Sequence, residues 1–308
     1  MAEQAAPPIR LSGFTFLRDA RRLGYPFEES IRSVLPVCDE FVIALGAGQD
    51  DTRERLLAMN EPKLRIIDTV WNEAMRSRGF VYGQQKMIAH YCCNGQWAFY
   101  LEGDEVLHEQ DLAGISAALD RYADDQNVEA FAFHYHHFFG SPDWLAVGPG
   151  WYRTAVRIIR NTCRAYSPDG LFFAVSDGNN KRLRYPRAVV LDETIYHYGH
   201  VRPAHMMQEK LAAVGKYWND DHRFDRYRID PRMLRRFEGS HPAVMQSWLA
   251  DHADNDFGPD ADHEPTSREK RLLLKMKLES WFGLDLSRRH YRRVGAGQGA
   301  SPAAQAAQ

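Results

Sequence analysis

The chain has 308 residues, 44% of them hydrophobic and 26% charged, which is typical of a globular protein with room for one large α/β domain. Its formal net charge of -2 gives no overall positive field for nucleic acid. The sequence has no run of about 18 apolar residues, so no membrane span is predicted. The four cysteines form no CxxC pair, which excludes a disulfide framework or the usual zinc spacing and favours a reducing, cytoplasmic location.

Short apolar runs alternate with helical patterns through the first hundred residues. Residues 1–10 are expected to form a flexible arm, after which the first strand pattern begins. The predicted order is strand 11–17, helix 26–35, strand 41–45, helix 52–59, strand 64–70, helix 80–91 and strand 97–101. This alternation, in units of roughly 30 residues, predicts a parallel doubly wound sheet, in which ligands bind beyond the carboxyl ends of the strands.

The second half of the chain mixes strand and helix patterns. The predicted order is helix 111–122 and then strands 128–133, 153–160, 183–190 and 195–198. From Pro203 onward the pattern is helical and strongly charged, and residues 295–308 have the composition of a disordered tail. We therefore expect one domain over 11–203, a helical extension over 204–294 and two flexible ends.

An apolar run from Trp97 to Leu101 ends abruptly in Glu102, Gly103 and Asp104. Side chains alternate along an extended chain, so Glu102 and Asp104 point to the same side, and Gly103 lets a ligand approach closely. Two hard oxygen ligands at the carboxyl end of a strand can hold a divalent ion, which in turn can hold a diphosphate. The alternative is a strand that is followed by an ordinary polar turn.

Groups that suit phosphate also occur at other predicted strand and helix ends. The glycine-rich turn over 46–51 either cradles a phosphate or nucleoside or is a plain strand-to-helix loop. Arg76, Gln85 and Lys86 lie near the start of a predicted helix, where basic and amide groups suit a diphosphate. A solvated helix face gives the same pattern, so both interpretations stay open.

Histidines recur at two predicted strand ends. Those within 134–137 lie in an aromatic setting and are interpreted as core or cleft-lining side chains. His197 follows at a later strand end, where it either completes the coordination of an ion held by Asp104 or is a satisfied structural histidine. Arg202 is placed to meet phosphate, and Asp169 is either a general base or an ordinary turn residue.

These elements, in this order, resemble the family 2 glycosyltransferases, and more closely a bacterial branch of that family. The likeness is carried by residues 14–20, 29–42, 66–71, 100–109, 150–153, 156–161 and 196–199. It covers most of residues 11–203 and implies the type A glycosyltransferase (GT-A) fold, an α/β domain built round a mostly parallel sheet. The helical extension over 204–294 would then be a lid or an acceptor platform.

The resemblance implies transfer of a sugar from a nucleotide diphosphosugar to an acceptor hydroxyl, with inversion at the anomeric carbon and with Mn²⁺ or Mg²⁺ as the cofactor. Glu102 and Asp104 stand at the Asp-any-Asp motif of the family. Asp104 is accordingly the expected metal ligand, Glu102 faces the ribose or the ion, and His197 is a late third ligand.

The same resemblance implies a general base and a nucleotide contact. Asp169 aligns best with the expected base, although Glu105 and Asp177 compete for that role. The Asp-Asp-Gly-Ser turn of the family is replaced over 45–48, and Asp51 is the acid that persists near the nucleotide. UDP is therefore favoured as the nucleotide only by its frequency in the family.

The leading hypothesis is a metal-dependent inverting glycosyltransferase of hexosyl type, acting on a carbohydrate or lipid-linked acceptor in bacterial envelope polysaccharide or glycolipid assembly. A sugar-1-phosphate nucleotidyltransferase is an alternative, although residues 18–24 lack its usual phosphate-loop spacing. A non-catalytic nucleotide- or carbohydrate-binding module is another. The basic amphipathic segment 268–293 either lies on the inner face of a membrane or packs on the domain with its charges in solvent.

Overall fold

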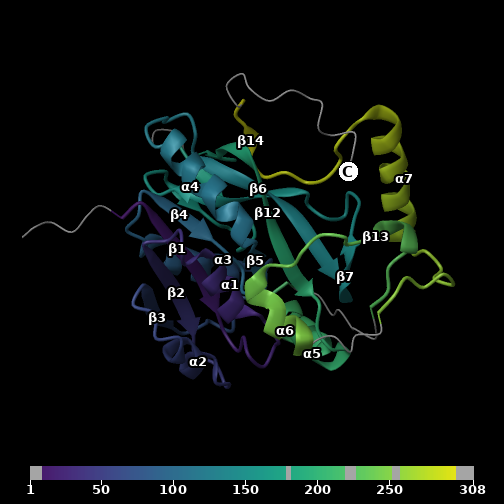
Figure 1. Ribbon diagram of the computed structural model, residues 1–308, viewed down its shortest axis with the longest axis horizontal. Coiled ribbons are helices and arrows are strands. Elements are labelled where there is room, and N and C mark those ends of the chain that lie inside the picture. The colour runs from purple at the N-terminus through teal and green to yellow at the C-terminus, as the bar shows by residue number, and fades with distance from the viewer. Residues whose placement is uncertain (1–8, 178–181, 219–226, 252–256, 296–308) are drawn as a thin grey trace, which may run out of the picture.

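The computed structural model describes residues 9–177, 182–218, 227–251 and 257–295 (Figure 1). The predicted arm 1–10 and tail 295–308 therefore fall almost wholly outside the described residues. The strands are β1 Leu11–Leu17, β2 Glu40–Gly46, β3 Leu64–Thr69, β4 Trp97–Tyr100, β5 Glu105–Leu107, β6 Ala130–Phe139, β7 Ser141–Ala146, β8 Thr154–Arg160, β9 Ala165–Tyr166, β10 Ala174–Ser176, β11 Leu183–Arg184, β12 Arg187–His200, β13 Leu234–Arg236 and β14 Arg292–Arg293. The α-helices are α1 Phe27–Val34, α2 Thr52–Ala58, α3 Phe80–Tyr91, α4 Leu112–Arg121, α5 Ala204–Gly215, α6 Gln246–Asp251 and α7 Ser267–Phe282.

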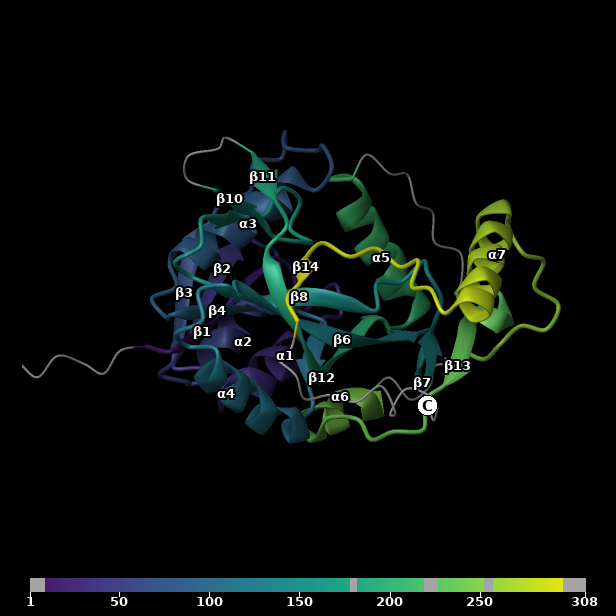
Figure 2. The same ribbon diagram turned by 90° about the horizontal axis from the view of Figure 1, so that it is seen from above.

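The strands β3, β2, β1 and β4 lie side by side in that order and are parallel. Alternate residues of β2 face opposite sides of the sheet, so Phe41 and Ile43 pack with α1 and α4 while Val42 packs with α3. Figure 2 shows α1 and α4 on one side of the sheet and α3 on the other. Apolar residues on both faces explain why these strands have nearly continuous hydrophobic sequences, and the predicted α/β fold is confirmed.

Beyond β4 the sheet continues with strands of mixed direction. β8 runs antiparallel between β4 and β6, and β7 and β13 extend the sheet antiparallel at the far edge. The two strands predicted over 183–190 and 195–198 lie mainly in one strand, β12, whose register against β6 shifts between Val190 and Thr194. β12 also pairs antiparallel with β5, which brings its end next to the acidic turn after β4.

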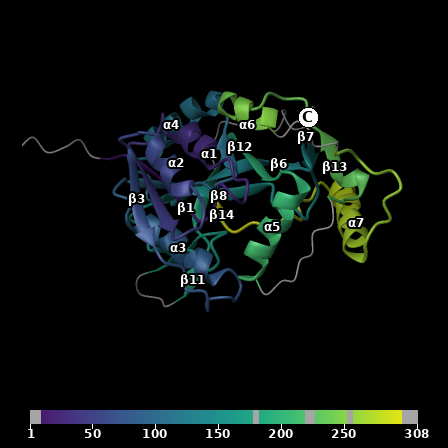
Figure 3. The ribbon, with the colours of Figure 1, turned by 90° about the horizontal axis from the view of Figure 1, so that it is seen from below.

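The chain after β12 is helical but also returns to the sheet. β13 pairs with β7, and β14 pairs with β12. Figure 3 shows α5 on the side of the molecule that also carries α3, with α7 apart at the outer edge. α7 begins with a capping box between Thr266 and Glu269 and ends at Gly283, whose φ of 61° is left-handed. Among the described residues, every helix is too short or too polar to cross a membrane.

Candidate active site

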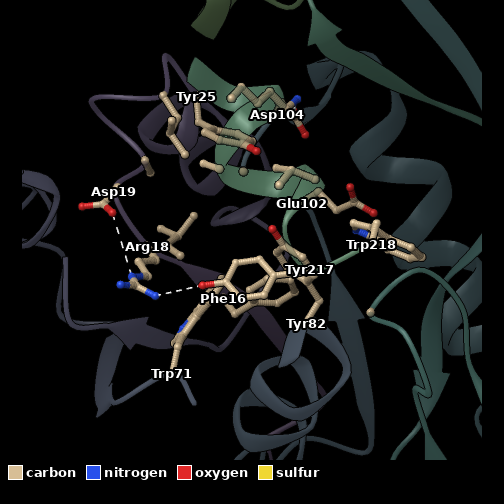
Figure 4. A pocket seen from close by; sticks show the side chains of 18 of the residues that line it. Phe16, Arg18, Asp19, Tyr25, Trp71, Tyr82, Glu102, Asp104, Tyr217 and Trp218 are labelled. Carbon is tan, nitrogen blue, oxygen red and sulfur yellow. Dashed lines mark hydrogen bonds and ion pairs between the residues drawn. The ribbon is translucent and has the colours of Figure 1, made fainter. Parts of the chain in front are cut away.

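A pocket of about 380 Å³ opens beyond the carboxyl ends of β1 and β4 (Figure 4). The turn after β4 lines it with Glu102 and Asp104, and the end of β12 contributes His197. α5 and the residues after it add Lys210 and Tyr217. The pocket therefore lies at the edge of the parallel strands where the sequence predicts a ligand.

The carboxylate of Asp104 is buried in a cluster of cations. Its Oδ2 atom accepts a hydrogen bond from Lys210 Nζ at 2.9 Å and faces Arg202 Nη2 at 3.4 Å. His197 Nε2 lies 3.7 Å from Oδ1. Burial would raise the pKa of Asp104, but Lys210 and Arg202 outweigh it and hold that pKa well below its usual range. Asp104 is therefore ionised in the folded protein.

Behind Asp104, a buried arginine binds the other two acids of the turn. Arg157 donates to both oxygens of Glu105, at 2.5 and 2.8 Å, and to Glu102 Oε1 at 3.0 Å. Tyr135 donates to Glu105 as well, at 2.8 Å. Burial and the neighbouring Glu105 raise the pKa of Glu102. Glu105 is fully enclosed by these contacts, whereas Glu102 keeps a quarter of its side chain exposed and lines the pocket.

A second histidine determines which nitrogen of His197 carries the proton. The Nε2 atom of His137 lies 2.8 Å from the carbonyl oxygen of Tyr152, which only an N–H can satisfy. Burial lowers the pKa of both His137 and His197, so both rings are neutral. The Nδ1 atom of His137 must then accept, and His197 Nδ1, 2.9 Å away, must donate. The lone pair of His197 is left on Nε2, which faces Asp104.

Glu102, Asp104 and His197 fit a divalent ion. One ligand atom from each of the three lies within 4.8 Å of the others. The lone pair of His197 and the carboxylate of Asp104 are both acceptors, so a cation between them removes an unfavourable contact. Gly199 leaves room here, because a Cβ atom would lie 2.4 Å from His197 Nε2 and 3.3 Å from Asp104 Oδ2. The two carboxylates suit Mn²⁺ and Mg²⁺, and the imidazole is better suited to a transition metal than to Mg²⁺.

The opposite wall of the pocket is aromatic. Trp71, Tyr82 and Tyr217 meet edge to face, with ring centroids 5.4 to 5.6 Å apart. Gly46, at the end of β2, makes this possible, because a Cβ atom there would lie 2.3 Å from Trp71 Nε1. Phe16 packs against Tyr82 from β1. The two walls together form a site with a charged end and an apolar, flat-sided end.

The structure brings Asp104, Glu102, His197 and Asp169 to this pocket. Asp169 lies in the turn before β10, where its Oδ1 atom accepts from the Leu171 N–H at 2.9 Å. That turn places one carboxylate oxygen of Asp169 in a fixed position at the pocket wall.

The other predicted phosphate groups lie elsewhere. Arg202 is fully buried behind Asp104 and donates to the carbonyl oxygen of Leu23. The ammonium of Lys86 is enclosed between the rings of Tyr100 and Phe173, at 3.8 and 3.9 Å from their centroids. These two cations support the site from behind and do not line the pocket.

Gln85, Arg76 and Asp51 are also outside the pocket lining. Gln85 is buried and accepts from Thr69, and Arg76 is exposed with its Nε atom donating to a backbone carbonyl. Asp51 is exposed beside α2, and the turn over 46–51 reaches the pocket through Gln49. The competing acid Asp177 is paired with Arg184 at 2.8 Å.

Sequence reasoning missed several residues of the site. Arg157 gave a signal, since a basic residue between Val156 and Ile158 in a strand must find a buried partner on one face. Lys210 gave none, because it lies in a charged helical segment with no motif. His137, predicted as a core or cleft-lining side chain, has a specific partner that no spacing reveals.

Comparisons with known proteins give no family assignment. No family model matches the chain, and no curated protein matches it. Among solved structures, S. aureus TarS is 13% identical with a TM-score of 0.35, over 50% of this chain and 28% of that one. TarS 1–349 in complex with UDP-GlcNAc is 12% identical with a TM-score of 0.38, over 68% of this chain and 66% of that one. The chain covers 28% of the length of TarS and 47% of TarS 1–349, which is less than two thirds of either.

Proposed function

We propose that the protein is a glycosyltransferase that moves a sugar from a nucleotide diphosphosugar to an acceptor hydroxyl. The observation that carries the proposal is the group of Glu102, Asp104 and His197, with the lone pair of His197 directed at Asp104. This group lies at the carboxyl end of a parallel sheet, beside an aromatic wall. The acidic group suits a divalent ion with a diphosphate, and the aromatic wall suits the base of the nucleotide.

The proposed donor spans the pocket from one wall to the other. The rings of Trp71, Tyr82 and Tyr217 offer apolar faces and edges for a nucleobase, and UDP is favoured by the family resemblance. The diphosphate lies toward Glu102 and Asp104, where Mn²⁺ or Mg²⁺, when bound, neutralises the charge of the leaving diphosphate. Because α5 lines this space, we propose that the extension 204–294 is a lid or an acceptor platform on a catalytic domain 11–203.

Asp169 is the proposed general base. Its carboxylate takes the proton of the acceptor hydroxyl, and the oxygen attacks the anomeric carbon opposite the diphosphate. The bond between that carbon and the diphosphate oxygen breaks, and the diphosphate leaves with the electron pair. Glu105 is a weaker candidate, because Arg157 and Tyr135 occupy both of its oxygens away from the pocket.

Thermal unfolding with UDP, GDP, CDP and dTDP, each with and without Mn²⁺, tests the proposal. A ligand that binds only the native state raises the melting temperature by mass action. A shift for one nucleotide that requires the metal is the expected result. A folded sample that responds to none of these ligands would contradict the transferase and favour a binding module for a different ligand.

An assay of sugar transfer then tests the base. Asp169→Asn is expected to keep the metal-dependent shift with the nucleotide and to lose transfer by about 10²- to 10⁴-fold. Asp177→Asn is the matched control, because it neutralises a nearby acid that binds Arg184 instead of lining the pocket. Full activity of Asp169→Asn would move the base elsewhere.

We also propose that the protein works at an anionic membrane, as assembly of a bacterial envelope glycan on a lipid-linked acceptor requires. One face of α7 packs inward through Leu272, Leu273 and Met276. The other exposes Trp281 and Phe282, at 71% and 66%, among exposed basic residues. Those basic residues are Arg268, Lys270, Arg271, Lys275 and Lys277. Aromatic side chains with surrounding cations match the headgroup region of an anionic bilayer.

Co-sedimentation with vesicles tests this surface. Phosphatidylglycerol vesicles should bind the wild-type chain, and phosphatidylcholine vesicles should bind it weakly. A Trp281→Ser/Phe282→Ser variant should lose most of the binding, while Leu57→Ser, which removes an exposed side chain from α2, should retain it. Equal binding by all three proteins would exclude α7 as the contact.

A further inference from the structure

Lys210 is a charged residue of the pocket that the reaction above does not use. Its ammonium donates to Asp104 Oδ2 and to the carbonyl oxygen of Gly199, both at 2.9 Å. It also lies 4.8 Å from the ring centroid of Tyr25. An ammonium has three N–H donors, so one remains for an oxygen of a ligand in the pocket that Lys210 lines.

Opposite charges lie close together around Lys210. Lys210 and Arg202 both face the ionised Asp104, while Arg157 pairs with Glu102 and Glu105. A divalent ion alone would add two positive charges beside Lys210, and a diphosphate alone would add negative charges beside Asp104. Both additions are unfavourable singly at short range in a partly buried site. The ion and the diphosphate together largely cancel each other's charge.

From these contacts we propose that Lys210 makes the binding of the divalent ion and of the nucleotide diphosphate depend on each other. The ammonium opposes an ion at Asp104 while the pocket is empty, and it donates its remaining hydrogen bond to the diphosphate when both ligands are present. This inference rests on the proposed function, because it assumes that the pocket takes this pair of ligands. It assigns Lys210 a positioning role for the donor and no part in the transfer itself.

A lysine that bound only the diphosphate would not change the affinity of the pocket for the ion alone. If the nucleotide raises the affinity for the ion by some factor, the ion raises the affinity for the nucleotide by the same factor. Removal of Lys210 should therefore change the two affinities in opposite directions. The ion alone should bind more tightly, since a repelling charge is gone, and the nucleotide should bind less tightly, since a donor is gone.

Binding measurements on Lys210→Met test this directly. Free Mn²⁺ is counted by its electron paramagnetic resonance signal, and UDP binding is measured by calorimetry with and without Mn²⁺. Arg32→Met is the matched control, because it removes an exposed cation from α1, outside the pocket lining. Matching circular dichroism spectra of the three proteins without ligands establish that the fold is intact, because loss of a cation beside the buried Asp104 is itself expected to lower the melting temperature.

The expected result is that Lys210→Met binds Mn²⁺ alone about tenfold more tightly than wild type and loses about tenfold of the coupling between Mn²⁺ and UDP. Weaker Mn²⁺ binding by the variant, or unchanged coupling, would overturn the inference while the nucleotide site stands. Binding of UDP by the wild type with no effect of Mn²⁺ would overturn it too. A wild type that binds neither ligand would instead refute the proposed function, and the inference would fall with it.

Discussion

The two walls of the pocket are held together by different forces. At the charged end, Asp104 and Glu105 are buried and each contacts at least one cation directly. At the aromatic end, Trp71, Tyr82 and Tyr217 pack against one another edge to face, so each ring contacts two others. Loss of one partner from a buried ion pair leaves an uncompensated charge, whereas loss of one ring from a cluster leaves the other rings in place. The charged wall should therefore be sensitive to single substitutions, and the aromatic wall should be tolerant of them.

The largest expected effect comes from Asp104→Asn at the centre of the charged wall. The amide keeps the shape but removes the charge that faces His197 and an ion. Metal-dependent nucleotide binding should be lost, which calorimetry with UDP and Mn²⁺ measures. Asp50→Asn, on the exposed loop before α2, is a control that should bind as the wild type does. Unchanged binding by Asp104→Asn would remove this residue from the proposed ligands.

The next largest effect is expected from Arg157, which binds Glu105 behind the charged wall. Arg157→Met leaves Glu105 buried without its cation, which should lower the free energy of unfolding by about 3–5 kcal/mol. Urea unfolding followed by circular dichroism measures this. A second variant, Arg157→Met/Glu105→Leu, removes both charges and should recover most of the loss. If the single variant were as stable as the wild type, the buried ion pair would not be structurally important.

Local sequence patterns predicted the strands and helices around the pocket better than they predicted the contacts between side chains of its two walls. The bounds of β1 and α3 match the predicted strand 11–17 and helix 80–91, because each has a continuous apolar or helical pattern. β5 and β7 were missed, since a strand of three residues or one interrupted by proline gives little periodicity. The single long β12 was predicted as separate pieces because polar residues lie at its register shift.

The residues of the site show the same difference between local patterns, which the sequence reveals, and long-range contacts, which it does not. Glu102 and Asp104 were predicted because they are two residues apart in one turn, and His197 because of its setting at a strand end. Lys210 lies 106 residues from Asp104 in sequence, so only the packing of α5 over the sheet brings the two together. Lys86 looked like a phosphate ligand, but the sequence does not show that α3 turns it inward between two rings.

A smaller effect is expected from the hydrogen-bonded pair of His137 and His197 in the charged wall, called here the histidine relay. His137→Phe keeps a flat ring against Tyr152 but removes the acceptor that fixes the proton on His197 Nδ1. Affinity for Mn²⁺ in the presence of UDP should fall about 10- to 100-fold, as for other residues that orient a metal ligand. His136→Phe, next along β6 and outside the relay, is the control. Equal affinities of the two variants would show that the relay does not orient His197.

On the aromatic wall the expected effect is smaller again. Trp71→Leu should weaken UDP binding by about 1 kcal/mol, at the low end for a stacking residue, because Tyr82 and Tyr217 remain. Calorimetry should show the same Mn²⁺ affinity as the wild type, since no atom of Trp71 is among the proposed ligands. A loss as large as that of Asp104→Asn would contradict the tolerant character of this wall.

The smallest effect concerns Glu73, at the rim of the aromatic wall. Arg18, at 2.5 Å, followed by Lys216 and Tyr217, lowers the pKa of Glu73 to about 2. A carboxyl whose pKa is lower in the folded state stabilises the protein above its unfolded pKa, about 4.5, and loses that contribution as the pH falls toward 2. Since 45% of the side chain is exposed, solvent screening should keep the contribution below about 1 kcal/mol.

Glu73→Gln isolates this contribution. The variant should unfold at a slightly lower urea concentration than the wild type at pH 7, and the difference should shrink as the pH falls from 5 to 2. Glu61→Gln, a half-exposed acid at the turn before β3, serves as the control for charge removal. A difference that grows at low pH, or one of several kcal/mol, would mean that the aromatic wall depends on a charge as strictly as the opposite wall does.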